Sequence, residues 1–237
     1  MKKSIFLLLA LMITGISTQL KAEEPKAEEP KELDPFHSIV ISSEIIAELV
    51  LSKKESIEPD FVGADNNNLI AEVVDSVLKL RMKTGKYKDA DLKLKIYYTR
   101  DLKRMEASSR ARIWSEEDLY FDNDLTVKLN NGGEIRFMLV CDSLSASLSQ
   151  GSVISLKGKA RALRVKASTN ATFSGYNFET TTTHAVASGT GKVKVSVSEY
   201  LNANATTKGF IGYVGEPDKV DEKTSLGGEI LKTFIDE

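Results

Sequence analysis

The sequence predicts an all-β solenoid, a fold in which the short strands of successive coils stack on one another. Three observations lead to this prediction. A motif returns about every 20 residues between Met105 and Val214, which is typical of a repeat architecture. Apolar and polar residues alternate on both sides of each repeat, as they do in β-strands. Between the alternating stretches lies a short segment rich in Gly, Asn, Ser and Thr, which suits a turn.

Six passes of the motif, 18 to 22 residues apart, begin at Ser108, Asn130, Ser149, Ser168, Ser188 and Thr206. The fourth residue of each pass is small. The sixth is bulky and apolar: Ile113, Ile135, Ile154, Phe173, Val193 and Ile211. The residues one and three positions before the later turns are apolar too, so we expect inward-facing rows. One coil cannot bury its row alone, and it therefore stacks on its neighbours.

The N-terminus predicts export. Lys2 and Lys3 precede an apolar run, Ile5 to Ile16, and Ala22 closes a short polar segment, which is the pattern of a signal peptide over residues 1–22. The run is too short to span a bilayer, so we expect no transmembrane segment in the mature chain. Residues 23–35 form an acidic Pro/Glu/Lys tract, which we predict to be a disordered linker.

Residues 36–237 are predicted to form one domain in three parts. Residues 36–100 supply an irregular N-terminal cap, 101–214 the regular coils and 215–237 a C-terminal cap. The caps are needed because an open ladder templates aggregation. Strand-like stretches in the first part are Ser38 to Ser42, Ile46 to Leu51, Val77 to Met82 and Leu92 to Thr99, and a helical turn capped by asparagine is expected to start within Asn66 to Glu72.

Charge and cysteine content narrow the classes of function. The net charge is −2, whereas binding to nucleic acid relies on neutralising phosphates with basic residues. We therefore expect no nucleic-acid partner. The single cysteine, Cys141, excludes an internal disulfide, and its apolar neighbours predict a buried, unreactive thiol.

The succession of segments resembles the head GIN domain family, which is named for autotransporter adhesins and occurs in exported bacterial proteins. The segments that carry the likeness are Asp34 to Ile41, Ala64 to Ile70, the Ser/Gly turns and Gly212 to Pro217. Two turns, at Ser108 and Ser168, lack the family's usual glycine. The resemblance implies a right-handed, single-stranded parallel β-helix and a role in adhesion. It implies no catalytic residues.

Candidate metal and catalytic residues are few. The two histidines, His37 and His184, have no Cys or second His nearby to make a zinc site. The acidic residues of 116–124 could supply oxygen ligands for calcium, but the order of an EF-hand is missing and a solvated loop is the favoured interpretation. We therefore predict no cofactor.

The candidate binding residues are Trp114, Tyr120, Lys128 and Lys166. Trp114 and Tyr120 offer aromatic surface beside the acidic loop. Lys128 and Lys166 occupy the outward position two residues before a turn, where the chain offers no acidic row of the kind that a polysaccharide-acting enzyme needs.

The sequence thus predicts a non-enzymatic exported β-solenoid, located in the periplasm or at the cell surface, that binds a glycan or protein partner. A polysaccharide-acting enzyme, a carrier of an apolar ligand such as a lipid, and a structural envelope component remain alternatives.

Overall fold

A computed structural model of the protein describes residues 30–87 and 89–234. The predicted signal peptide and residues 23–29 of the predicted linker lie outside the described residues. Lys31–Glu32 forms a short strand, β1, that pairs antiparallel with Ser56 and Ile57. The prediction of an unfolded segment is therefore wrong for these two residues, because pairing with a strand satisfies their backbone groups.

The described residues form one sheet of 18 strands and one turn of 3-10 helix. The elements of the N-terminal part are β1 (Lys31–Glu32), β2 (Ser38–Ile41), β3 (Ile46–Leu51), β4 (Ser56–Val62), η1 (Asn66–Asn68), β5 (Leu69–Val74), β6 (Val77–Met82) and β7 (Asp91–Tyr98). Those that follow are β8 (Arg104–Ala107), β9 (Arg112–Trp114), β10 (Leu119–Phe121), β11 (Leu125–Leu129), β12 (Glu134–Leu148), β13 (Val153–Ser168), β14 (Thr172–Ser188), β15 (Lys192–Thr206), β16 (Phe210–Val214), β17 (Lys219–Ser225) and β18 (Glu229–Lys232).

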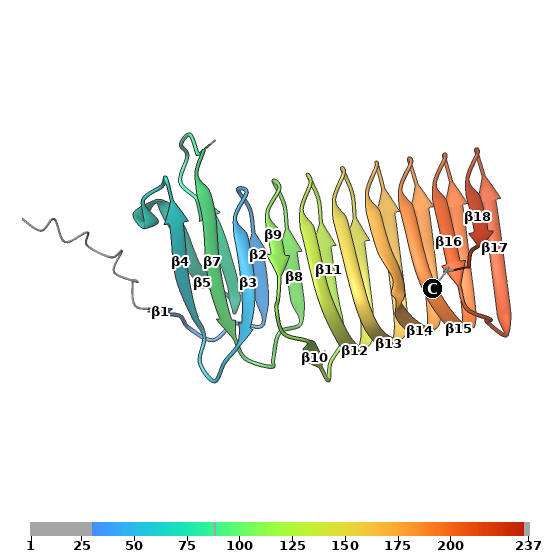
Figure 1. Ribbon diagram of the computed structural model, residues 1–237, viewed down its shortest axis with the longest axis horizontal. Helices are drawn as coiled ribbons and strands as arrows, with labels where there is room; N and C mark the ends of the chain where they lie inside the picture. The colour runs from blue at the N-terminus through green and yellow to red at the C-terminus, as the bar shows by residue number, and fades with distance from the viewer. Residues whose placement is uncertain (1–29, 88, 235–237) are drawn as a thin grey trace, which may run out of the picture.

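Neighbouring coils pair in parallel. β12 pairs with β13 from Glu134↔Val153 to Leu148↔Ala167, so corresponding residues lie 19 positions apart. The same pairing joins β13 to β14, β14 to β15, and β15 to both β16 and β17. Figure 1 shows the coils following one another along the long axis of an elongated stack. The prediction of a parallel β-solenoid is confirmed.

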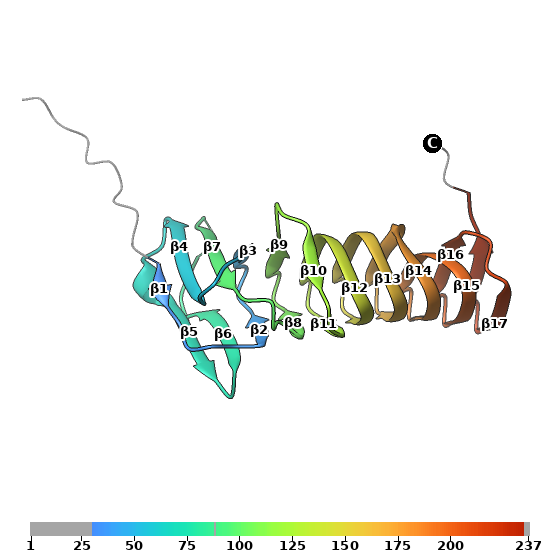
Figure 2. The same cartoon turned by 90° about the horizontal axis from the view of Figure 1, so that it is seen from below.

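Each coil has two arms, joined by a tight turn on one side and a corner on the other. The first half of β12 pairs with β9 and β10 and the second half with β11. Alternation breaks at the corner, where Asp142 and Ser143 both face outward between buried Cys141 and Leu144. We call the arm after each turn the post-turn arm and the arm before it the pre-turn arm. Figure 2 shows the corners of β12 to β15 from below.

The predicted inward rows form the core. The sixth residues of the six passes are all at most 1% exposed: Ile113, Ile135, Ile154, Phe173, Val193 and Ile211. The residues before the turns, among them Leu129, Ala167 and Ala205, are equally buried. Buried Ser152 occupies the small fourth position, and its hydroxyl donates a hydrogen bond to the Ser149 carbonyl at 2.7 Å. The inward rows of the sequence analysis are confirmed.

Each turn holds two consecutive residues in the left-handed region. The φ angles are 53° and 72° at Gln150 and Gly151, and 49° and 62° at Thr169 and Asn170. The Gly151 N–H donates to the Thr169 carbonyl of the next coil at 3.0 Å. Turns without glycine therefore keep the same geometry, because the stacked neighbours hold a conformation that costs about 1–2 kcal/mol for other residues.

The order of the coils along the stack differs from their order along the chain. β2 pairs in parallel with both β6 and β8, and β3 with both β7 and β9. The chain thus begins one coil inside the stack, builds the outer coil β6–β7 and then returns to β8–β9, as Figure 1 shows. The four strands lie where we predicted strand-like stretches. They form regular coils, however, where we had expected an irregular opening of the stack.

Antiparallel strands provide the N-terminal cover. β4 pairs with β7 and β5 with β6. Pro59 of β4 has no N–H to donate, which makes this strand a poor template for further pairing. η1 forms at the predicted place, but its cap is Asp65 rather than an asparagine: the Asp65 carboxylate accepts a hydrogen bond from the Asn67 N–H at 2.8 Å.

The C-terminal end carries one coil more than predicted. β17 pairs with β15 and β18 with β16, so regular coils continue beyond Val214, the end that we had expected. On this last coil the inward positions include Glu222 and Lys232, in register with Ala203 and Tyr213. The Lys232 ammonium lies 2.6 Å from the Glu216 carboxylate. Inward-pointing charges make the open edge a poor partner for another strand.

We expect Ile154→Ala to lower the free energy of unfolding by about 2–5 kcal/mol, because it removes buried methyl groups and leaves a cavity. Lys166→Ala, on the exposed face of the same strand, should change it by less than about 0.5 kcal/mol. Denaturant titration measures both. Equal effects would contradict the assignment of the inward row.

Gly151→Ala isolates the cost of the left-handed turn, because a Cβ at this position meets no atom within 4 Å. We expect a loss of about 1 kcal/mol from backbone strain alone. The converse change, Thr169→Gly, relieves the strain and should be neutral or stabilise by up to about 1 kcal/mol. Thermal unfolding of both variants would contradict this account if Gly151→Ala proved neutral.

Candidate binding surface

The structure does not bring the four predicted binding residues together. Trp114 lies half-buried on the outer face of a post-turn arm, in β9. Lys128 and Lys166 are exposed on the pre-turn arms, which form the opposite sheet of the stack, two coils apart with Ser147 between them. Tyr120 is 58% exposed in β10, near the corners. Of the four, Trp114 lines a depression in the surface.

Trp114 begins an outward row that crosses the post-turn arms. Successive pairs in register are Trp114↔Arg136, Arg136↔Ser155, Ser155↔Ser174, Ser174↔Lys194 and Lys194↔Gly212. We call these six residues the Trp114 row. At the usual separation of paired strands the row is about 24 Å long. It offers an aromatic ring, two cations and two hydroxyls along one line.

An aromatic hollow marks the N-terminal end of the row. Trp114 lines a depression of about 280 Å³ together with Ile46, Glu48, Asp60, Lys93, Leu94 and Lys95. Glu48 is in register with both Trp114 and Lys95. Carboxylates and ammonium groups thus surround one side of the indole, a combination suited to a ligand with a stacking face and polar edges.

Tyr176 and Lys194 form a second aromatic site near the C-terminal end. The Lys194 ammonium lies 5.6 Å from the centre of the Tyr176 ring, within the range of a cation–π contact. Gly212 makes this possible, because a Cβ at Gly212 would stand 2.2 Å from the Tyr176 hydroxyl oxygen. That hydroxyl also lies 3.5 Å from the Thr233 side-chain oxygen.

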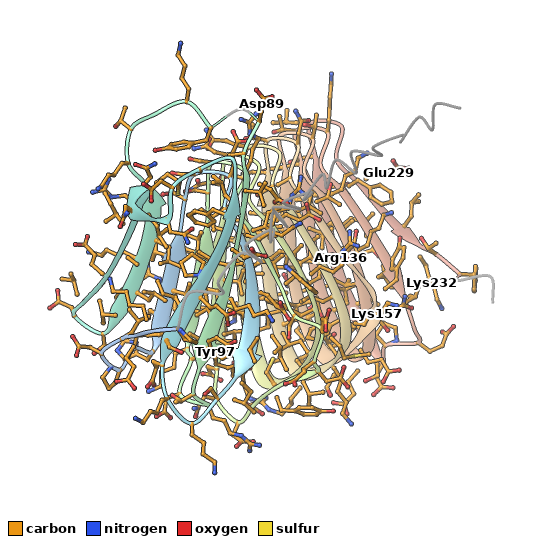
Figure 3. The ribbon with its side chains drawn as sticks, turned by 60° about the vertical axis from the view of Figure 1, so that its left-hand side comes forward. Asp89, Tyr97, Arg136, Lys157, Glu229 and Lys232 are labelled. Atoms are coloured by element: carbon orange, nitrogen blue, oxygen red, sulfur yellow. The ribbon has the colours of Figure 1, made fainter. Side chains whose placement is uncertain are left out.

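The post-turn face carries more basic than acidic groups. Glu134 lies 3.5 Å from both Arg112 and Arg136, so its charge is already matched. Lys157, Lys192 and Lys194 form no ion pair within 4.0 Å in the described part of the chain. Figure 3 shows Arg136 and Lys157 on the same face of the stack.

A second depression, of about 560 Å³, runs along the corners. Its floor includes buried Cys141, Ala160 and Thr180, and Arg161 stands at its edge. Arg161 donates two hydrogen bonds to the Asp142 carboxylate, at 2.9 and 2.8 Å, which lower the pKa of that carboxyl. A lowered pKa keeps Asp142 ionised, unlike the proton donor of a glycosidase.

Both histidines contact neighbouring side chains. His184 is an exposed strand residue whose ring packs edge-on against Tyr200 at 5.8 Å, and His37 contacts the Ser38 hydroxyl at 3.0 Å. Within residues 30–87 and 89–234, no group of three His, Cys, Asp or Glu side chains is placed to hold a metal ion. Calcium binding by residues 116–124 stays an untested possibility of the sequence.

Most of the Trp114 row was not predicted from the sequence, although the repeat carries a signal for it. Every member is the seventh residue of its pass, directly after the buried sixth residue. We considered only the outward position before each turn, and so chose Lys128 and Lys166. Lys157 and Tyr176 lie beyond the residues that define the repeated motif, so the repeat did not point to them.

Fold and surface together define a class: a parallel β-solenoid with a polar, aromatic outer face. The sequence over residues 35–217 matches the family described as "Putative auto-transporter adhesin, head GIN domain", and the chain belongs to this family. The resemblance found in the sequence is thereby confirmed. No match was found among curated proteins. None of the helical structure in the described residues is long and apolar enough to cross a membrane.

Solved structures share the fold. A "putative adhesin" from Bacteroides fragilis NCTC 9343 has a TM-score of 0.74 and 20% identity over 86% of this chain and 94% of that chain. Another, from Parabacteroides merdae ATCC 43184, has a TM-score of 0.65 and 18% identity over 86% and 95%. A "putative lipid binding protein" from Parabacteroides distasonis ATCC 8503 has a TM-score of 0.61 and 16% identity over 87% and 96%.

We expect Cys141 to resist thiol reagents in the native protein. Burial, followed by the nearby Asp142 and Asp124 charges, raises the pKa of its thiol to about 12, so very little reactive thiolate exists at pH 8. Labelling by a chromogenic disulfide reagent should be slow in buffer and fast in denaturant. Rapid labelling of the folded chain would contradict the burial of Cys141.

Proposed function

We propose that this protein is a non-enzymatic, exported scaffold of the adhesin type that binds an extended surface glycan along the Trp114 row. The observation that carries the proposal is the row itself: Trp114, Arg136, Ser155, Ser174 and Lys194 follow one another in register on consecutive coils. A solenoid presents such a row at constant spacing, which suits a ligand that is itself a repeating chain.

The chemistry of the row supports a glycan over a protein partner. Indole and phenol rings pack on the apolar faces of sugar rings, while hydroxyl and charged groups hydrogen-bond the sugar hydroxyls. Trp114 and Tyr176 supply the rings at the two ends, and Ser155 and Ser174 the hydroxyls between them. A protein interface would instead favour a compact apolar centre.

Two other functions are less well supported. A polysaccharide-acting enzyme needs paired acid and base groups, but Glu134, an acidic residue beside the row, is held between Arg112 and Arg136. A lipid carrier, the function suggested by the name of the Parabacteroides distasonis neighbour, needs internal space. Fully buried side chains, among them Phe173 and Phe178, occupy the interior here.

The proposed location is outside the inner membrane, in the periplasm or at the cell surface. Support comes from Lys2, Lys3 and the apolar run over residues 5–16, and from the family's association with adhesins. Cell fractionation tests this location directly. Recovery of the chain in the cytoplasm would contradict it.

We expect the mature protein to bind on a glycan array, and Trp114→Ala to weaken that binding about tenfold or more, as loss of an aromatic anchor does. Arg136→Ala should weaken it as well. Tyr120→Ala is the matched control, because it removes an exposed aromatic ring away from the row and should leave affinity unchanged. Thermal unfolding verifies that each variant is folded. If neither Trp114→Ala nor Arg136→Ala changes the affinity for the glycan, the proposal is wrong.

A further inference from the structure

We infer that the glycan is anionic, carrying carboxylate or sulfate groups that bind a lysine cluster around β14. This inference rests on the proposed function and names its substrate class. The lysine cluster consists of Lys157 on β13 and of Lys192 and Lys194 on β15.

The three lysines surround polar groups of β14. In register, Lys157 pairs with Asn177, Thr172 with Lys192, and Ser174 with Lys194. Thr172 and Ser174 thus face ammonium groups of β15, whereas Asn177, further along β14, faces the Lys157 ammonium of β13. An oxyanion that lies along β14 between Ser174 and Asn177 would have Lys194 on one side and Lys157 on the other, and charge-assisted hydrogen bonds are stronger than neutral ones.

The cluster has no counter-charge of its own. None of its lysines has an ion pair within 4.0 Å in the described residues. Lys157 and Lys194 belong to the strands on either side of β14. A ligand anion bound on β14 is therefore about 5 Å from each of these strands at the usual strand spacing, which is within the Debye length of about 8 Å at physiological salt. Glu179, the acidic residue of β14, is in register with Lys159 and lies nearer the corner.

Local irregularity concentrates these groups. The register between β14 and β15 shifts between Gly175 and Glu179, and that between β13 and β14 between Ser155 and Lys157. β14 therefore bulges at Tyr176 and Asn177, and bulges redirect side chains next to binding sites. The Tyr176 ring beneath the Lys194 ammonium adds a stacking surface next to the cations.

A glycan fits this cluster better than nucleic acid. Domains that bind nucleic acid are strongly basic over a wide surface, whereas this chain has a net charge of −2 and a cluster of three lysines on one face. A sugar polymer with intermittent acidic groups matches a narrow row in which cations, hydroxyls and aromatic rings follow one another.

The test compares three oligosaccharides on the full chain without its signal peptide: heparin fragments with sulfates, oligogalacturonate with carboxylates, and uncharged cello-oligosaccharide. We expect at least one anionic probe to bind at least tenfold more tightly than the neutral one, with affinity falling as salt rises. Lys157→Gln with Lys194→Gln should weaken that binding tenfold or more. Lys128→Gln with Lys166→Gln removes equal charge from the opposite face and should change it less than twofold.

The outcomes separate this inference from the proposed function. If the neutral probe binds tightly and Trp114→Ala weakens that binding, the proposed function stands and the anionic ligand is overturned. Equal losses in the two double variants mean diffuse charge attraction and overturn the lysine cluster. Tighter binding of a single-stranded oligonucleotide than of either anionic glycan overturns the glycan. No binding of any probe overturns both.

Discussion

One constraint governs the whole molecule: every coil must place its apolar side chains over those of the next. A coil of about 19 residues cannot enclose a core of its own, so its inward row is buried only by stacking. Each fully buried Ile, Leu or Phe contributes about 1.5–3 kcal/mol of transfer free energy. Because a shift of one residue would turn the inward row toward solvent, burial of residues such as Ile135 and Ile154 also fixes the register of the outer rows.

The turns follow from the same constraint. Left-handed residues are unfavourable for side chains such as Thr169 and Arg110, yet both adopt φ angles near those of glycine. The arms on either side are already fixed by their neighbours, and the turn amides bond to the turn of the adjacent coil. Glycine is therefore useful at these positions without being required. At the small fourth position of a pass, space is short: a Cβ at Gly191 would stand 2.3 Å from the Ala167 carbonyl oxygen.

The sequence predicts what is periodic and misses what is not. The repeat over 101–214 and its inward rows follow from alternation, which burial imposes on every coil. The position of β2 and β3 inside the stack does not, because periodicity carries no information about the order in which the chain fills coils. The coil β17–β18 was assigned to the C-terminal cap instead of to the regular coils, because Glu222 and Lys232 occupy its inward positions. Trp114 was recognisable by its type, whereas Lys157 gained meaning only from its place beside β14.

The solenoid separates stability from recognition more completely than a globular domain does. Inward residues alternate with outward ones along each arm, so Ser155 can change without disturbing Ile154 or Leu156. In a regular stack each coil presents its outward residues in the same geometry, so no place along the stack differs in backbone shape from the next. The bulge of β14 changes the backbone there, and the absence of a side chain at Gly212 leaves space for Tyr176. Irregularities that the fold itself does not require are found mainly at functional sites. The bulge of β14 is such an irregularity, and it lies near the end of the Trp114 row, where an aromatic ring, a hydroxyl and a cation are close together.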